Sequence, residues 1–301
     1  VRARRAGGAH ASSLMARPAL ERMLVAGADL RTNMLPEAGF NNSYYVGPRA
    51  PPPGSLVRSS CTCNPLTPLV DAALGHGGAA DGAARAAEGA EFTAVMDDVR
   101  ARLRRVLDLP EGTGIVLAAS GTDAELFPIA IARALNPHAE QVRTVISASK
   151  EIGKGVALAA GGVYSSPQTP MRALGEAHYG GDDAAAFLSA DLPDDLVAGV
   201  RSCVVPNRDE RGALVDARAV NTKELDDALG AREPLILHSV QGTKTNQREP
   251  YPPADFAARG ATPGRDVFVV VDACQARCTN GELAQWLDDG AITLVTGAKF
   301  Y

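Results

Sequence analysis

The stretch DVFVVVDACQARCTNGELAQWLDDGAITLVTGAKFY, residues 266–301, decides the fold. Its first apolar run, 266–273, is rich in valine and nearly continuous, which is typical of a strand that is covered on both faces. A second apolar run, 291–297, follows after a stretch long enough for one helix. The succession of strand, helix and strand indicates a parallel α/β sheet.

Similar apolar runs lie earlier in the chain, at 114–120, 143–149, 201–206 and 234–239. Helical stretches separate most of them. An amphipathic helix is expected before the first run, from the apolar side chains at Phe92, Val95, Val99, Leu103 and Val106. We therefore predict an α/β domain over residues 86–301, with a mostly parallel sheet and helices on both faces. Residues 1–85, which are rich in proline and glycine in places, are expected to form an irregular N-terminal segment.

The composition excludes several classes of protein. The chain has 301 residues, 46% of them hydrophobic, which is ample for a core. With 30 Lys and Arg against 35 Asp and Glu, the net charge of -5 predicts neither nucleic acid nor an anionic membrane as a partner. No stretch approaches the roughly 18 apolar residues of a membrane helix.

The cysteines and the N-terminus bear on the compartment. Five cysteines, an odd number in a long chain, are read as structural thiols without metal, so a cytoplasmic location is expected. The arginine-rich first residues leave an organelle transit remnant as the alternative.

Polar groups follow several predicted strands, at the sheet edge where α/β proteins bind ligands. Gly121, Thr122 and Asp123 follow the run 114–120 and open a helix, whose amide groups would suit a phosphate. Thr122 and Glu125 have the spacing of a capping box, so an ordinary capped helix is the alternative.

An acid and a lysine close the last two runs. Asp272 ends the run 266–273, where a carboxylate needs a partner unless it merely caps the next helix. Lys299 follows the run 291–297 by two residues. At the end of a strand, a lysine can become a nucleophile instead of staying solvated. A phosphate site, an acid and a lysine are the groups that pyridoxal phosphate requires.

The order of SGTDAE (120–125), DACQ (272–275) and TGAK (296–299) resembles the fold type I pyridoxal-phosphate enzymes, over roughly residues 86–301. The similarity is greatest to the class V aminotransferase and cysteine desulfurase branch. The resemblance implies that Lys299 binds the cofactor as a Schiff base. It also implies that Asp272 pairs with the pyridine nitrogen and that Gln275 reaches the ring hydroxyl.

The resemblance implies further contacts. Gly121, Thr122 and Asp123 would hold the phosphate, with the Thr296 hydroxyl. In LILHSVQG (235–242), Ser239 or Gln241 would contact the cofactor, whereas His238 is read as structural. Desulfurases place a ring-stacking histidine where this chain has Glu151 or Ile152, a departure that weakens the desulfurase interpretation.

The implied function is an enzyme that acts on an amino acid, most similar to a class V aminotransferase. A truncated, non-catalytic interaction fragment, a pyridoxal-phosphate lyase or desulfurase, and an unrelated nucleotide-binding α/β domain are the alternatives. In the family the chain continues past the lysine into another strand and a small domain, so an incomplete chain is expected. The intact protein is expected to be a homodimer, which sedimentation would test.

Overall fold

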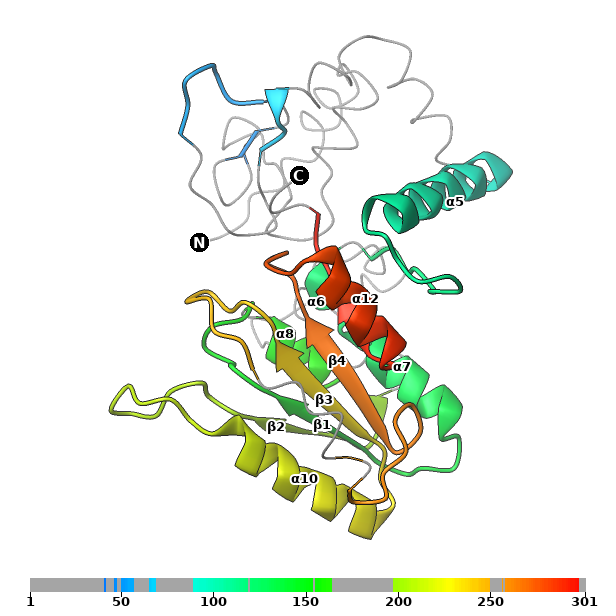
Figure 1. The fold of residues 1–301 in the computed structure, drawn as a ribbon, viewed down its shortest axis with the longest axis vertical. Coiled ribbons are helices and arrows are strands. Elements are labelled where there is room, and N and C mark those ends of the chain that lie inside the picture. The colour runs from blue at the N-terminus through cyan, green and yellow to red at the C-terminus, as the bar shows by residue number, and fades with distance from the viewer. Residues whose placement is uncertain are drawn as a thin grey trace, which may run out of the picture. The chain divides into compact units, whose positions relative to one another are not determined.

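The computed structural model describes residues 41, 46–47, 50–56, 65–68, 89–118, 120–153, 155–163, 197–249, 256 and 258–297. The chain divides into two compact units, of which the larger comprises Arg104–Pro167 and Met171–Gly297 and contains the whole sheet (Figure 1). Most of the predicted segment 1–85, and Lys299, lie outside the described residues. Before residue 104, the longest described segment belongs to helix α5 (Gly89–Val106), which confirms the amphipathic helix that the apolar spacing predicted.

The larger unit is built on a parallel sheet of five strands in the order β2-β1-β3-β4-β5. The strands are β1 (Val142–Ile146), β2 (Val200–Val204), β3 (Leu235–Val240), β4 (Val267–Asp272) and β5 (Ile292–Leu294). Each lies within or next to a predicted apolar run, and every pairing is parallel. The predicted α/β class is therefore confirmed.

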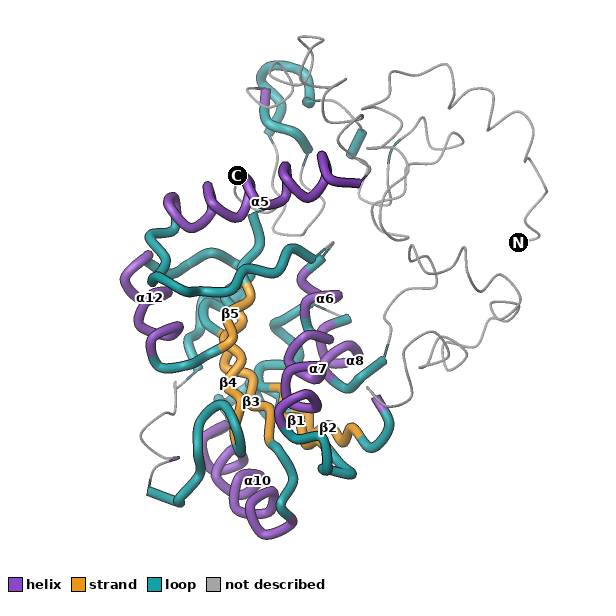
Figure 2. The backbone as a smooth tube through the Cα atoms, turned by 90° about the vertical axis from the view of Figure 1, so that its right-hand side faces the viewer, coloured by secondary structure: helices purple, strands orange, loops and turns teal. Residues whose placement is uncertain are grey.

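Helices cover both faces of the sheet (Figure 2). On one side lie α10 (Ala217–Ala231) and α12 (Asn280–Asp288). On the other lie α7 (Leu126–Leu135), α8 (Val156–Ala160) and the short α6 (Gly121–Ala124), which leads into α7. No helix in these described ranges combines the length and the apolar character needed to cross a membrane.

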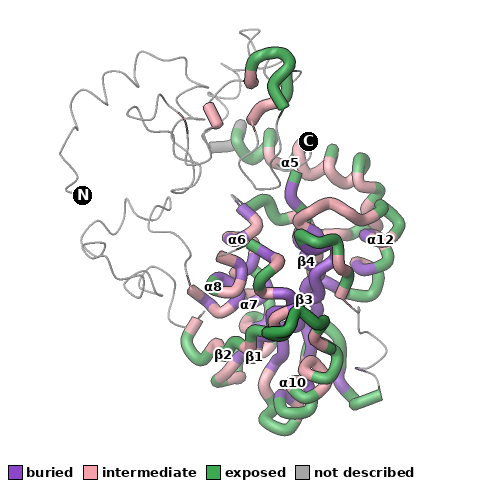
Figure 3. The backbone as a smooth tube through the Cα atoms, turned by 90° about the vertical axis from the view of Figure 1, so that its left-hand side faces the viewer, coloured by how far each residue is buried: buried purple, intermediate pink, exposed green. Residues whose placement is uncertain are grey.

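The two strands β3 and β4 explain why a continuous apolar run predicts a strand in this sheet. All six residues of β3 and all six of β4 are buried (Figure 3). Leu235 and Leu237 pack into the cluster that holds α10 and α12, whereas Ile236 packs against α7. Because successive side chains point to opposite faces, a strand between two helical layers must be apolar at every position.

Helix α12 begins where its sequence predicts a good start. Thr279 is its N-cap, and its side chain and that of Glu282 form a complete capping box. Leu283 and Trp286 are the buried residues of the helix and pack into the cluster beneath β4. The helix thus spans the connection between β4 and β5 with one apolar face on the sheet.

The predicted strand at 114–120 is wrong. Residues 114–118 and Ser120 form no strand and pair with none of the strands described above. The residues Val116 and Leu117 are 63% and 36% exposed. An apolar run becomes a strand only when a neighbouring strand accepts its backbone hydrogen bonds, and in the described part of the chain this segment has no such neighbour.

Candidate functional site

Asp272 lies at the carboxyl end of β4, on the face of the sheet that α6, α7 and α8 cover. It is the register partner of Val240 in β3, and Val240 packs with the apolar side chains of α8. The residue Asp272 is 7% exposed. Its Oδ1 accepts a hydrogen bond from the backbone N–H of Cys274 at 3.0 Å, so it turns the chain after β4. It does not cap the next helix, because Thr279 has that role.

The start of α6 lies against the segment that follows Asp272. A Cβ atom added to Gly121 would lie 3.2 Å from the sulfur of Cys274, closer than side chains normally approach. Ala124 and Cys274 also pack against the same apolar cluster, which includes Val270. The structure therefore brings the predicted phosphate-binding segment and the predicted acid to one end of one sheet face, although they are about 150 residues apart in the chain.

The predicted capping box of Thr122 and Glu125 is wrong. The N-cap of α6 is Ser120, whose hydroxyl accepts a hydrogen bond from the Asp123 amide at 3.2 Å and donates one to the Asp123 carboxylate at 2.8 Å. Thr122 is buried instead of capping. Because Ser120 already uses the Asp123 amide, the amide groups of Gly121 and Thr122 are the better donors for an anion at this turn.

Glu125 turns inward and meets His238 of β3. Both side chains are 1% exposed, and Glu125 Oε2 lies 2.8 Å from His238 Nε2. His238 Nδ1 lies 3.1 Å from the backbone oxygen of Val145 in β1. Burial raises the pKa of Glu125, and His238 opposes that shift in part. Burial disfavours the charged form of His238, but the charge and hydrogen bond of Glu125 outweigh it, and the pKa of His238 is raised.

The remaining predicted site residues occupy different situations. The Gln241 amide nitrogen donates to Ser239 Oγ at 3.0 Å and to the Glu249 carbonyl at 2.7 Å, so it secures the chain after β3. Gln275 Oε1 is buried and finds no hydrogen-bond partner among the described residues. Thr296, after β5, is 9% exposed.

Glu151 joins the chain segments that follow three strands. Its carboxylate accepts hydrogen bonds from the Thr243 hydroxyl at 2.6 Å, from the Thr245 amide at 3.0 Å, and from the Asn207 amide group. Burial alone would raise the pKa of Glu151, but these hydrogen bonds outweigh it and lower the pKa to about 2. The carboxyl ends of β1 and β3, where the strand order reverses, are thus bridged by protein side chains, and Ile152 beside Glu151 is buried.

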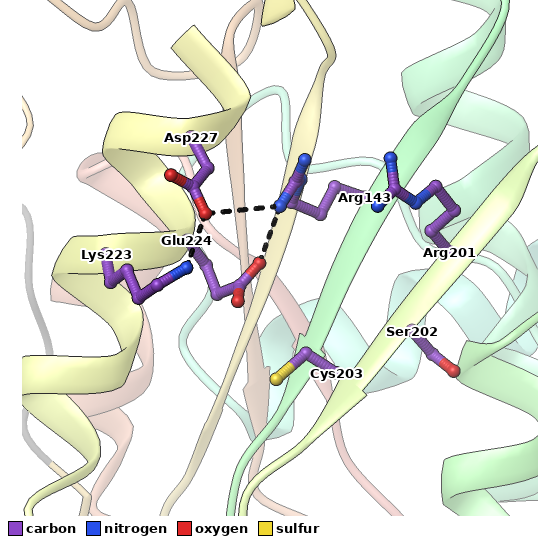
Figure 4. A pocket seen from close by; sticks show the side chains of 7 residues that line it. All are labelled: Arg143, Arg201, Ser202, Cys203, Lys223, Glu224 and Asp227. Carbon is purple, nitrogen blue, oxygen red and sulfur yellow. Dashed lines mark hydrogen bonds and ion pairs between the residues drawn. The ribbon is translucent and has the colours of Figure 1, made fainter. Parts of the chain in front are cut away.

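A pocket of about 310 Å³ lies elsewhere, between α10 and the strands β1 and β2 (Figure 4). Its cationic and anionic side chains neutralise one another. Arg143 lies 2.8 Å from Glu224 and 2.9 Å from Glu233, and Lys223 lies 2.6 Å from Asp227. Burial and then the charge of Glu224 raise the pKa of the Cys203 thiol in this pocket. The paired charges and the protonated thiol make the pocket a weak candidate for chemistry.

Comparison with known proteins gives no relative from which a role could be transferred. No protein-family model matches the chain, and no curated protein or solved structure matches it.

Proposed function

We propose that this protein is a pyridoxal-phosphate-dependent enzyme that acts on an amino acid, with chemistry of the class V aminotransferase kind and a large domain of fold type I. The observation that carries the proposal is the approach of Gly121 to Cys274. Gly121 begins α6, and Cys274 lies two residues after Asp272, a buried residue at the carboxyl end of a strand in the parallel sheet, so this approach supports a common site.

Two features of the described residues fit the cofactor. Asp272 is a buried acid that could accept a hydrogen bond from a protonated ring nitrogen. Gln275 Oε1 is a buried acceptor without a partner among the described residues, as expected of a group that serves a ligand hydroxyl. When bound, pyridoxal phosphate supplies an electron sink for a carbanion at the substrate Cα.

The other groups have defined tasks under this proposal. The amides of Gly121 and Thr122, with the hydroxyl of Thr296, would bind the phosphate. Lys299 would hold the cofactor covalently, and its Nζ would move the proton to and from the substrate Cα. Gln241 would have a supporting role, because its amide nitrogen already secures the segment after β3.

The test is to identify the lysine that binds the cofactor. The full-length protein is incubated with pyridoxal phosphate, reduced with borohydride and digested, and the modified lysine is mapped by mass spectrometry. We expect one labelled site, Lys299, and loss of the label in Lys299→Ala. Lys244→Ala is the matched control, because Lys244 lies at the same sheet edge but donates to the Ile152 carbonyl at 2.8 Å.

Two outcomes of this experiment would contradict the proposal. Stoichiometric labelling of a lysine other than Lys299 would overturn the assignment of the site. Absence of any absorbance from a bound cofactor in the full-length protein would contradict the proposed function itself.

A further inference from the structure

The buried pair Glu125–His238 has no task in the function proposed above. The two residues are 113 positions apart in the chain and join α6 to β3 by a contact of 2.8 Å. Burying two ionisable side chains to 1% exposure is costly unless each satisfies the other. The energetic cost of the pair therefore depends on how many protons its two side chains hold and on which atoms carry them.

The contacts fix the number of protons that the pair holds. A backbone carbonyl can only accept, so at 3.1 Å from the Val145 oxygen, His238 Nδ1 carries a hydrogen. A neutral imidazole of that tautomer has a lone pair on Nε2. An ionised Glu125 would then place a second lone pair 2.8 Å away, which is repulsive. One proton must lie between Nε2 and Oε2, either as a carboxylic acid or as an imidazolium, and in both forms the pair has no net charge.

Asp272 is the further titratable group near this pair. It lies on β4, next to β3, and its charge favours the protonated forms of both Glu125 and His238. On β1, the charged residue is Arg143, which is engaged by Glu224 of α10 on the opposite face. On α7, the Arg133 guanidinium donates to the Ala139 carbonyl.

We infer that Glu125 and His238 are positioning residues that share a single proton and so keep the protein beneath Asp272 free of net charge. A neutral pair places no competing cation beneath the Asp272 carboxylate, as a partner for a protonated ring nitrogen requires. This last step rests on the proposed function, whereas the shared proton does not. The raised pKa of both Glu125 and His238 agrees with a proton that is hard to remove.

The shared proton is tested by nitrogen-15 NMR of the histidine side chains in the cofactor-free protein. The chain has five histidines, so His238→Gln assigns the signal of His238 by its disappearance. We expect His238 to keep one protonation state from about pH 5 to about pH 8, where a free imidazole titrates. Titration of His238 near its ordinary value would overturn the inference.

The consequence for Asp272 is tested by cofactor affinity. Glu125→Gln keeps a hydrogen on the Nε2 contact and keeps the pair neutral, so pyridoxal phosphate should bind within about threefold of the wild type. Glu125→Ala leaves the buried Nε2 of His238 without its partner and opens a cavity between α6 and β3, so the support beneath Asp272 is lost and binding should weaken about tenfold or more. Equal weakening in both variants would contradict the positioning role.

The two hypotheses can fail separately. A non-titrating His238 together with unlabelled Lys299 would refute the cofactor and retain the shared proton. A labelled Lys299 together with a titrating His238 would retain the cofactor and refute the shared proton.

Discussion

A histidine inside an all-buried strand must find a hydrogen-bond partner, or its burial costs free energy. In this protein the partner of His238 is Glu125. Glu125 is equally buried, so each side chain supplies the hydrogen-bond partner that the other needs. The contact replaces two separate desolvation penalties with one neutral, hydrogen-bonded unit. The folding stability of the protein must therefore depend on pH through the proton that Glu125 and His238 share.

Replacing Glu125 should change the sign of that pH dependence. Because the pKa of His238 is raised above 6.5 and that of Glu125 above 4.5, the folded protein holds the pair's proton more tightly than the unfolded chain. The resulting stability is fully present below pH 6.5 and is lost as the pH rises through the folded pKa. In Glu125→Gln, His238 must stay neutral to accept from the amide, so burial favours folding at higher pH.

The measurement is the free energy of unfolding in urea at about pH 6 and about pH 9 for both proteins. The advantage of the wild type over Glu125→Gln should shrink by on the order of 1 kcal/mol between the two. Parallel pH dependence in the two proteins would show that the pair does not hold the proton as described.

At the scale of single residues, the sequence predicts the positions of some side chains but not the contacts of others. The position of Asp272 at the end of β4 could be predicted, because an acid that closes a valine run is conspicuous and its strand is unambiguous. The spacing of Glu125 from Thr122 predicts a capping box, whereas its inward contact depends on how α6 lies over β3. A partner 113 residues away cannot be read from local spacing.

At the scale of elements, the entry to β2 depends on a glycine. Gly199 has φ +72°, and a Cβ atom added there would lie 2.4 Å from the backbone oxygen of Glu140. Its own carbonyl accepts a hydrogen bond from Val142 at the start of β1, at 3.1 Å. The chain before β2 and the chain before β1 therefore approach each other more closely than any side chain allows.

Gly199→Ala should consequently destabilise the protein by more than about 2 kcal/mol, through backbone strain and the clash with Glu140 together. Gly260→Ala separates the two effects, because Gly260 has φ +69° but nothing within 4 Å of the added Cβ. That control should lose only about 1 kcal/mol. Equal losses in the two variants, measured by urea unfolding, would mean that the approach to Glu140 is unimportant.

The elements themselves could largely be predicted from apolar runs. The runs around β3 and β4 are continuous, and such strands are covered on both faces whatever their neighbours. The run 114–120 has the same composition but forms no strand. Composition reports that a segment is apolar, whereas strand formation also requires a partner at the right place, which is a property of the assembled sheet.

At the scale of the whole molecule, Glu151 ties together chain segments that leave different strands. It follows β1, accepts from Asn207 after β2, and accepts from Thr243 and Thr245 after β3. All of these neighbours donate to the carboxylate. From the sequence, Glu151 stands only at the place of a stacking histidine, because its own loop and the two loops that supply its donors come together only in the folded sheet.

The hydrogen bonds that Glu151 accepts should stabilise the protein less in acid. The pKa of Glu151 is lowered from 4.5 to about 2, so its contribution to stability is fully present above pH 4.5 and is lost as the pH falls through about 2. Glu151→Gln should be less stable than the wild type near neutral pH, by about 1–3 kcal/mol, because the amide nitrogen must face a donor. The difference should shrink steadily as unfolding is measured toward about pH 3. Glu210→Gln, on the exposed loop after β2, is the control and should follow the wild type at every pH. If the deficit of Glu151→Gln stayed constant from neutral pH to acid, its carboxylate charge would not be what joins the three loops.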